Sequence, residues 1–178
     1  GNVGLGYGKA KEVPAAIQLA AYALRIAEAL ELDPGMQKDI CYGSWLHDCG
    51  KIGVPESILN APRALTEEEF AIVKKHPVWG MEVARKANLS PAIQDILLYH
   101  HERYDGTGYP TGLAGNDIPL ETRIVSIADC YDALCSVRPY RPAIPPQTAR
   151  DIIAEQSGTA FDPTILDVFI SCIITQAA

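Results

Sequence analysis

The sequence predicts an all-α protein, a compact single-domain helical bundle. Along most of the chain, apolar residues recur at the three- and four-residue spacing of amphipathic helices. Alternating runs rich in β-branched residues, which would indicate strands, are few. The 178 residues suit one domain, and a hydrophobic content of 48% is enough to fill a sizeable core.

Capping signals define where the helices begin. Pro14 is a favourable first residue for an Ala/Leu-rich helix. Thr66 and Glu69 form a capping-box pattern, and Ser90 and Asp162 each precede a proline as N-cap residues. The predicted helices cover residues 14–31, 36–48, 67–75, a segment after Pro77, 91 to the double histidine at 100, 121–136, 146–156 and 163–175.

The remaining stretches are predicted to be loops. Residues 1–13 are expected to form a flexible N-terminal segment ahead of one domain over residues 14–178. Residues 50–65 and 102–120 lack helical periodicity, and a loop as long as the second is usually functional.

Charge and composition exclude several classes of partner. The net charge is −7 and no basic stripe is present, so a nucleic acid polymer is not expected to bind. A small phosphate ligand stays compatible with the sequence if positive charge is local. No apolar run reaches the roughly 20 residues needed to cross a membrane. The five cysteines are odd in number and form no CxxC pair, which favours a reducing, cytoplasmic location.

Histidines and aspartates gather at helix ends and polar breaks. Each one has an ordinary structural explanation: a histidine can cap a helix, and Asp129, inside an apolar helix, could pair with Arg123, Arg138 or a backbone group. Taken together, these imidazoles and carboxylates suit a first-row divalent metal, and Asp48 could bridge two ions through its two oxygens. The candidates are His47, Asp48, His76, His100, His101 and Asp129.

Several motifs resemble one known family. They are LHDCGKIGVPESIL at 46–59, LTEEEF followed by KKHPVWG at 65–80, YHHERYDGTGYPTGLAGNDIPL at 99–120, RIVSIADCYDALCSVRPYRPA at 123–143 and SGTAFDP at 157–163. In this order and spacing, they are similar to the HD-GYP domain, a branch of the HD phosphohydrolase superfamily. The similarity covers about 120 residues of the chain.

The resemblance implies a fold of the HD-domain type and a cyclic di-GMP phosphodiesterase. The product would be pGpG, with GMP as an alternative end product. The cofactors would be two divalent metal ions, iron or manganese, held by the six candidates above. The resemblance gives catalytic roles to Asp48, as a metal ligand, and to Lys51, which matches the lysine that approaches the scissile phosphate. The substrate-binding residues implied by position are Lys51, Tyr109, Asp132, Arg138 and Arg141.

The sequence departs from the family at one ligand. The family has a further histidine in its first helix, and counting back from His47 leads to Ala15, with no histidine anywhere upstream. The first metal site would keep His47, Asp48 and Asp129, while the second site is complete. The alternatives are an enzyme of reduced activity, substitution by Glu12, a shifted register, or a one-metal domain that senses cyclic di-GMP or binds proteins.

Other functions stay open at this point. A different HD hydrolase acting on nucleotides such as dNTPs is disfavoured by the GYP loop, but only through the resemblance. The implied partners are the cyclic dinucleotide, a diguanylate cyclase or sensor domain contacted through RYDGTGYPTGL, and a second copy in a homodimer. A loop that merely closes over the metal site is the alternative to that protein contact.

Overall fold

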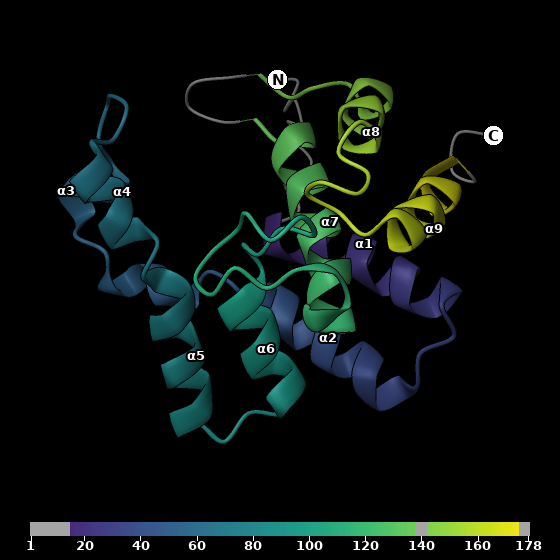
Figure 1. The fold of residues 1–178 in the computed structure, drawn as a ribbon, viewed down its shortest axis with the longest axis horizontal. Coiled ribbons are helices and arrows are strands. Elements are labelled where there is room, and N and C mark those ends of the chain that lie inside the picture. The colour runs from purple at the N-terminus through teal and green to yellow at the C-terminus, as the bar shows by residue number, and fades with distance from the viewer. Residues whose placement is uncertain (1–14, 138–141, 175–178) are drawn as a thin grey trace, which may run out of the picture.

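The computed structural model describes residues 15–137 and 142–174. The regular elements in these ranges are helices joined by loops (Figure 1). The α-helices are α1 (Ala15–Ala29), α2 (Pro34–Leu46), α3 (Glu56–Leu59), α4 (Glu67–Val73), α5 (His76–Lys86), α6 (Pro91–Tyr99), α7 (Leu120–Cys135), α8 (Pro146–Ala154) and α9 (Pro163–Ile174), with 3₁₀ turns η1 (Cys49–Gly53) and η2 (Gly115–Asp117). Within these ranges no strand is present, which confirms the all-α prediction. The predicted flexible segment, with Glu12, lies outside the described residues.

The capping signals identified most helix starts correctly. The side chain of Thr66 accepts from the backbone of Glu69, whose carboxylate accepts from the backbone of Thr66 in return. Ser90 accepts from Ile93 N, and Asp162 accepts from Thr164 N. The stretch predicted as a loop at 50–65 instead contains η1 and α3. Helices of four or five residues are too short to show the apolar periodicity that reveals longer ones.

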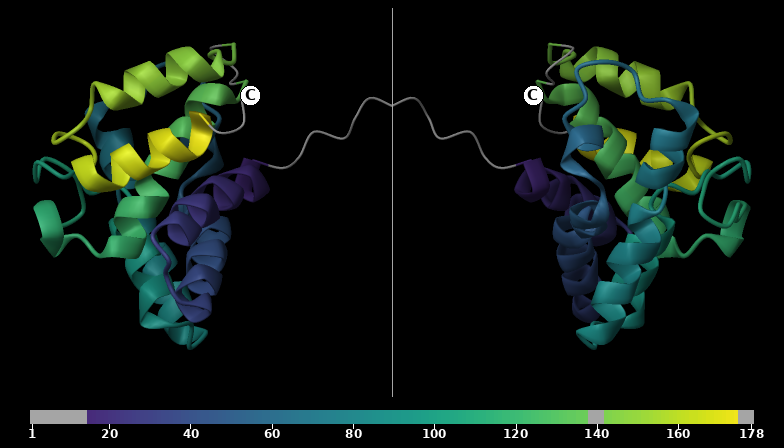
Figure 2. Two further views of the ribbon diagram at one scale, coloured as in Figure 1. Left: turned by 90° about the vertical axis from the view of Figure 1, so that its right-hand side faces the viewer. Right: turned by 90° about the vertical axis from the view of Figure 1, so that its left-hand side faces the viewer.

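Helix α7 is the centre of the bundle. It contacts α1, α2, α6, α8 and α9, and its residues Ile124, Val125, Ile127 and Ala128 are fully buried. Helices α8 and α9 lie toward one end of the molecule, whereas α5 and α6 lie toward the other (Figure 2). Because Asp129 belongs to this helix, one predicted metal ligand is carried by the central element of the fold.

Helices α3 and α4 project from the bundle beside α5 (Figure 1). The connection between them is tied to α4 by Arg63, whose guanidinium donates two hydrogen bonds of 2.8 Å to the carboxylate of Glu69. Since Glu69 also completes the cap of α4, one side chain stabilises both the helix start and the loop before it. None of the helices in the described ranges combines the length and the apolar character needed to traverse a bilayer.

The turn η1 lies directly against α5. A Cβ atom added at Gly50 would be 1.9 Å from the carbonyl oxygen of His76 and 2.6 Å from the nitrogen of Gly80. Only glycine permits this approach, because any side chain would have to overlap the backbone of α5. This contact sets the position of Asp48, at the start of η1, relative to His76 at the start of α5.

We therefore expect Gly50→Ala to destabilise the domain. Overpacking of this kind costs about 1–3 kcal/mol, which corresponds to a loss of roughly 3–10 °C in Tm for a chain of this size. Thermal unfolding followed by circular dichroism measures the change. Gly35→Ala, in the exposed first turn of α2, is the control: its Cβ would meet only the exposed Asp33 side chain, at 3.0 Å, so Tm should change much less than in Gly50→Ala. Equal Tm values for wild type and Gly50→Ala would contradict the proposed contact.

Candidate metal centre

Three buried histidines have their rings fixed by the same local interaction. In each, Nδ1 lies within hydrogen-bonding distance of a backbone carbonyl one turn earlier in the chain. A carbonyl can only accept, so Nδ1 carries the proton and the neutral ring keeps a lone pair on Nε2. The pairs are His47 with Ser44 at 2.7 Å, His76 with Val73 at 2.7 Å, and His100 with Leu97 at 3.0 Å.

These Nε2 atoms converge on the carboxylate of Asp48. Its Oδ1 lies 3.3 Å from Nε2 of His76 and 3.8 Å from Nε2 of His100. Its Oδ2 lies 3.4 Å from Nε2 of His47 and accepts a 2.6 Å hydrogen bond from Nζ of Lys51. The two oxygens therefore face two different groups of side chains, which is the arrangement that a bridging carboxylate requires.

One group forms a complete donor set. Atoms of Asp48, His76, His100 and His101 all lie within 4.8 Å of one another. The Nε2 atoms of His76 and His100 are only 3.3 Å apart, and both face inward. Two lone pairs at that separation repel each other unless a cation lies between them. Three imidazoles and one carboxylate are a suitable donor set for a first-row divalent metal, so these residues fit the metal that the sequence predicts.

The other group contains fewer donors. Nε2 of His47 lies 3.6 Å from Oδ1 of Asp129. Helix α1, which begins at Ala15, packs against both α2 and α7, the helices next to these two residues. Arg123, considered as a partner for Asp129, instead pairs with Asp162 at 2.5 Å. Arg138, the other arginine considered, lies outside the described residues.

Charge at the centre is divided unequally between its members. Burial would raise the pKa of Asp48, but the imidazoles of His100, His47 and His76 outweigh it and hold this pKa well below the usual range. Burial also lowers the pKa of His47, yet its hydrogen bond to Asp48 and the charge of Asp129 raise it overall to about 9. At neutral pH a proton therefore occupies Nε2 of His47, and a metal would displace that proton.

Two other groups are held neutral. Burial, followed by the neighbouring His100 and His76, lowers the pKa of His101 to about 2. Burial and the charges of Asp48 and Asp129 raise the pKa of Tyr109 to about 12. A neutral imidazole is the form that ligates a metal, so the His101 ring is ready to bind without losing a proton.

The predicted substrate-binding residues are only partly described. The ring of Tyr109 is stacked on that of His101, with centroids 4.8 Å apart and an interplanar angle of 17°. Asp132 is buried on α7, one turn after Asp129. Arg138 and Arg141 lie outside the described residues.

Glu102 holds the loop that follows the double histidine, a role that the sequence did not reveal. Its carboxylate is 4% exposed and accepts hydrogen bonds from the backbone nitrogens of Thr111 at 2.7 Å and Gly112 at 3.0 Å. The position of Glu102 directly after His101 in the motif was the one available indication that it matters to the site. Its bonding partners lie nine and ten residues further along and could not be identified without the fold.

Gly108 brings the same loop back onto the histidine segment. A Cβ atom there would be 2.4 Å from the nitrogen of Arg103 and 2.5 Å from Cα of Glu102. Close approach of the backbone, rather than a left-handed conformation, is what requires glycine at this position. Tyr109 N then donates to His101 O at 3.2 Å, which places the Tyr109 ring beside its histidine partner.

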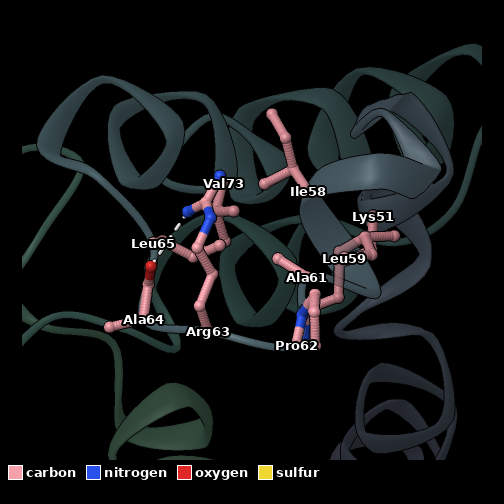
Figure 3. Close-up of a pocket in the computed structure, with 9 residues that line it drawn as sticks. All are labelled: Lys51, Ile58, Leu59, Ala61, Pro62, Arg63, Ala64, Leu65 and Val73. Atoms are coloured by element: carbon pink, nitrogen blue, oxygen red, sulfur yellow. Dashed lines mark hydrogen bonds between the residues drawn. The ribbon is translucent and has the colours of Figure 1, made fainter.

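Two cavities adjoin the centre, and residues of α4 contribute to the lining of both. The smaller, of about 360 Å³, is lined by His100, His101 and Asp129 together with Phe70 and Lys74 of α4. The larger, of about 660 Å³, is bounded by η1, α3, α4 and the connection between these helices (Figure 3). Its lining residues are Lys51, Ile58, Leu59, Ala61, Pro62, Arg63, Ala64, Leu65 and Val73. Lys51 links this cavity to the metal centre through its bond to Asp48.

We expect Glu102→Gln to loosen the loop at 103–113. Both backbone nitrogens donate to Oε1, and Gly112 N also donates to Oε2. The amide leaves a neutral acceptor in place of a charged one and removes the bond to Oε2, at a cost of about 1 kcal/mol. Faster hydrogen exchange at Thr111 and Gly112, measured by mass spectrometry, would reveal the change. Glu82→Gln, an exposed position on α5, provides the control. Unchanged exchange in the loop would show that the carboxylate does not hold it.

The chain is similar to known proteins of one family. A family model described as "HD domain" matches residues 7–165. A protein of Vibrio cholerae named cyclic di-GMP phosphodiesterase is 44% identical over 133 residues, which cover 71% of this chain and 27% of that protein. A Thermotoga maritima protein of the same name is 41% identical over 149 residues, which cover 82% of this chain and 40% of that protein. The chain thus spans less than half the length of these curated relatives.

Solved structures share the fold. Bd1817, an HDG"Y"P protein from Bdellovibrio bacteriovorus, superposes with a TM-score of 0.73 at 22% identity, covering 90% of this chain and 51% of that one. The match of the family model to most of the chain, with the similar sequences and the shared fold, decides the family that the motifs suggested. The chain belongs to the HD domain family, as a member of its HD-GYP branch.

Proposed function

We propose that this domain is a metal-dependent phosphodiesterase that hydrolyses cyclic di-GMP to pGpG, with GMP as a further product. The observation that carries the proposal is the convergence of Asp48, His76, His100 and His101 within 4.8 Å beside an open cavity. The names of the V. cholerae and T. maritima relatives support the substrate. Because the chain spans only part of those proteins, their activity is applied here as a proposal.

The chain's own residues have defined tasks in this reaction. When bound, the metal would neutralise charge on the phosphodiester and lower the pKa of a water molecule. Asp48 holds the two halves of the centre together through Oδ1 and Oδ2. Lys51 bonds to Asp48 and keeps 40% of its side chain exposed, so its ammonium can turn to a phosphoryl oxygen in the developing transition state.

The other substrate contacts are also proposals. Tyr109 borders the smaller cavity with its ring face on His101, and its phenol stays neutral. Arg138 and Arg141 would bind phosphate oxygens, for which guanidinium groups are well suited. Asp132 would position these cations from its buried place on α7.

We propose two metal ions, iron or manganese, with the complete donor set binding the first to be loaded. His47, Asp48 and Asp129 would bind the second ion more weakly, because the family's first-helix histidine is missing near Ala15. Glu12, which lies outside the described residues, is a candidate replacement. A one-metal domain that binds cyclic di-GMP without cleaving it is the competing proposal, and the missing ligand is the observation that favours it.

Further features of the wider protein remain proposals. They are a cytoplasmic location, a homodimer, and contact of the loop at 103–113 with a diguanylate cyclase or sensor domain. The exposed position of much of that loop is compatible with such a contact.

The activity is tested directly with manganese- or iron-loaded protein. Incubation with cyclic di-GMP should yield pGpG, detected by chromatography. Asp48→Ala should abolish turnover, because it removes a donor from both halves of the centre. Asp151→Ala, which removes an exposed carboxylate on α8, should retain full activity. A wild-type rate no higher than that of Asp48→Ala would refute the enzyme, and cleavage of dNTPs instead would assign another substrate.

Metal content distinguishes the two proposals. We expect nearly two ions per chain in protein saturated with manganese, and about one after dialysis, because the incomplete set binds more weakly. Inductively coupled plasma mass spectrometry measures both values. Ala15→His should raise the dialysed content toward two and increase turnover. One ion per chain under saturation, with cyclic di-GMP bound but uncleaved, would favour the regulatory domain.

A further inference from the structure

A group of aromatic and cationic side chains stands at the outer edge of the metal centre. Phe70 of α4 meets Tyr109 edge to face, with ring centroids 6.5 Å apart and an interplanar angle of 80°. Nζ of Lys74, one turn later on α4, lies 4.8 Å from the Phe70 centroid and 5.4 Å from that of Tyr109. The three side chains come from two segments about thirty residues apart and meet over one cavity.

This group is continuous with the proposed catalytic site. Phe70, Lys74 and Tyr109 line the same cavity of about 360 Å³ as His101 and Asp129. Tyr109 is stacked directly on His101, so its ring lies between the proposed metal ligand and the side chains of Phe70 and Lys74. A ligand bound at the metal donors and extending along the cavity would therefore meet these side chains.

Phe70 and Lys74 contact each other and Tyr109, yet both side chains stay open to solvent. Phe70 is 44% exposed, so part of its ring is free to contact a ligand. Lys74 is exposed, and among the residues that the structure describes no carboxylate lies within 4 Å of its ammonium. The chain carries 22 acidic and 15 basic residues, so a lysine held only against ring faces is not explained by a shortage of carboxylates.

We propose that Phe70 and Lys74 form a second substrate subsite, which binds the half of the cyclic dinucleotide remote from the scissile phosphate. The proposal rests on the function proposed above. A cyclic dinucleotide has two phosphates and two bases, and the metal centre engages one phosphate. Lys74 pairs with the other phosphate, and the exposed face of Phe70 stacks on a base, as aromatic residues do with unpaired bases. Tyr109 positions both side chains.

The test compares a cyclic and a minimal substrate. Phe70→Ala and Lys74→Met should each raise KM for cyclic di-GMP about tenfold, the loss expected for one stacked base or one phosphate contact. They should leave hydrolysis of methyl p-nitrophenyl phosphate unchanged, because that diester has one phosphate and no base. Phe70→Trp should restore the wild-type KM. Tyr42→Ala, which removes an aromatic ring of similar exposure on α2, and Lys75→Met are the matched controls.

A binding measurement separates this inference from the proposed activity. Calorimetry with a hydrolysis-resistant phosphorothioate analogue of cyclic di-GMP should show about tenfold weaker affinity for both variants on the metal-loaded protein. Wild-type protein that cleaves neither diester would refute the activity, while the affinities would still decide the subsite. Unchanged KM and affinity in Phe70→Ala and Lys74→Met, equal losses on both diesters, or no binding of the analogue would overturn the subsite.

Discussion

The candidate centre depends on one carboxylate, that of Asp48. Four side chains from three different parts of the chain approach its two oxygens, and each approaches a specific oxygen. The histidines reach it with Nε2 because backbone carbonyls hold their Nδ1 protons, so the helices themselves determine which nitrogen faces inward. In the absence of metal, a low pKa at Asp48 and a proton on His47 keep this group of charges balanced.

Much of the fold followed from local chemistry in the sequence. Thr66, Ser90 and Asp162 announce helix starts because a side-chain oxygen must accept from the first free backbone amides, and this requirement needs no tertiary information. The elements that escaped prediction, η1, α3 and η2, are shorter than two helical turns. The turn η1 packs against α5 through contacts such as that of Gly50, which a linear pattern cannot show.

In the candidate site, too, some residues could be predicted from the sequence and others could be found only from the fold. The sequence identified the residues that the structure brings together around Asp48, because histidine and aspartate at helix ends stand out in an otherwise apolar pattern. It did not reveal the role of Glu102, which bonds to backbone nitrogens nine and ten residues further along the chain. Nor did it reveal Phe70 and Lys74, which look like ordinary surface residues of a short charged helix. Only the fold brings α4 over the GYP loop. Arg138 and Arg141 remain predictions from the motif.

The contact of Gly50 with α5 has a consequence for how such a domain can diverge. The spacing of Asp48 from His76 depends on a contact of main chain with main chain, between Gly50 and the first turn of α5. Drift in the hydrophobic core can therefore alter stability while the distance between these two donors stays constant. Sequence changes elsewhere therefore have little effect on the spacing of these two donors. Helix α4 projects from the bundle, so its exposed residues can change to suit different ligands.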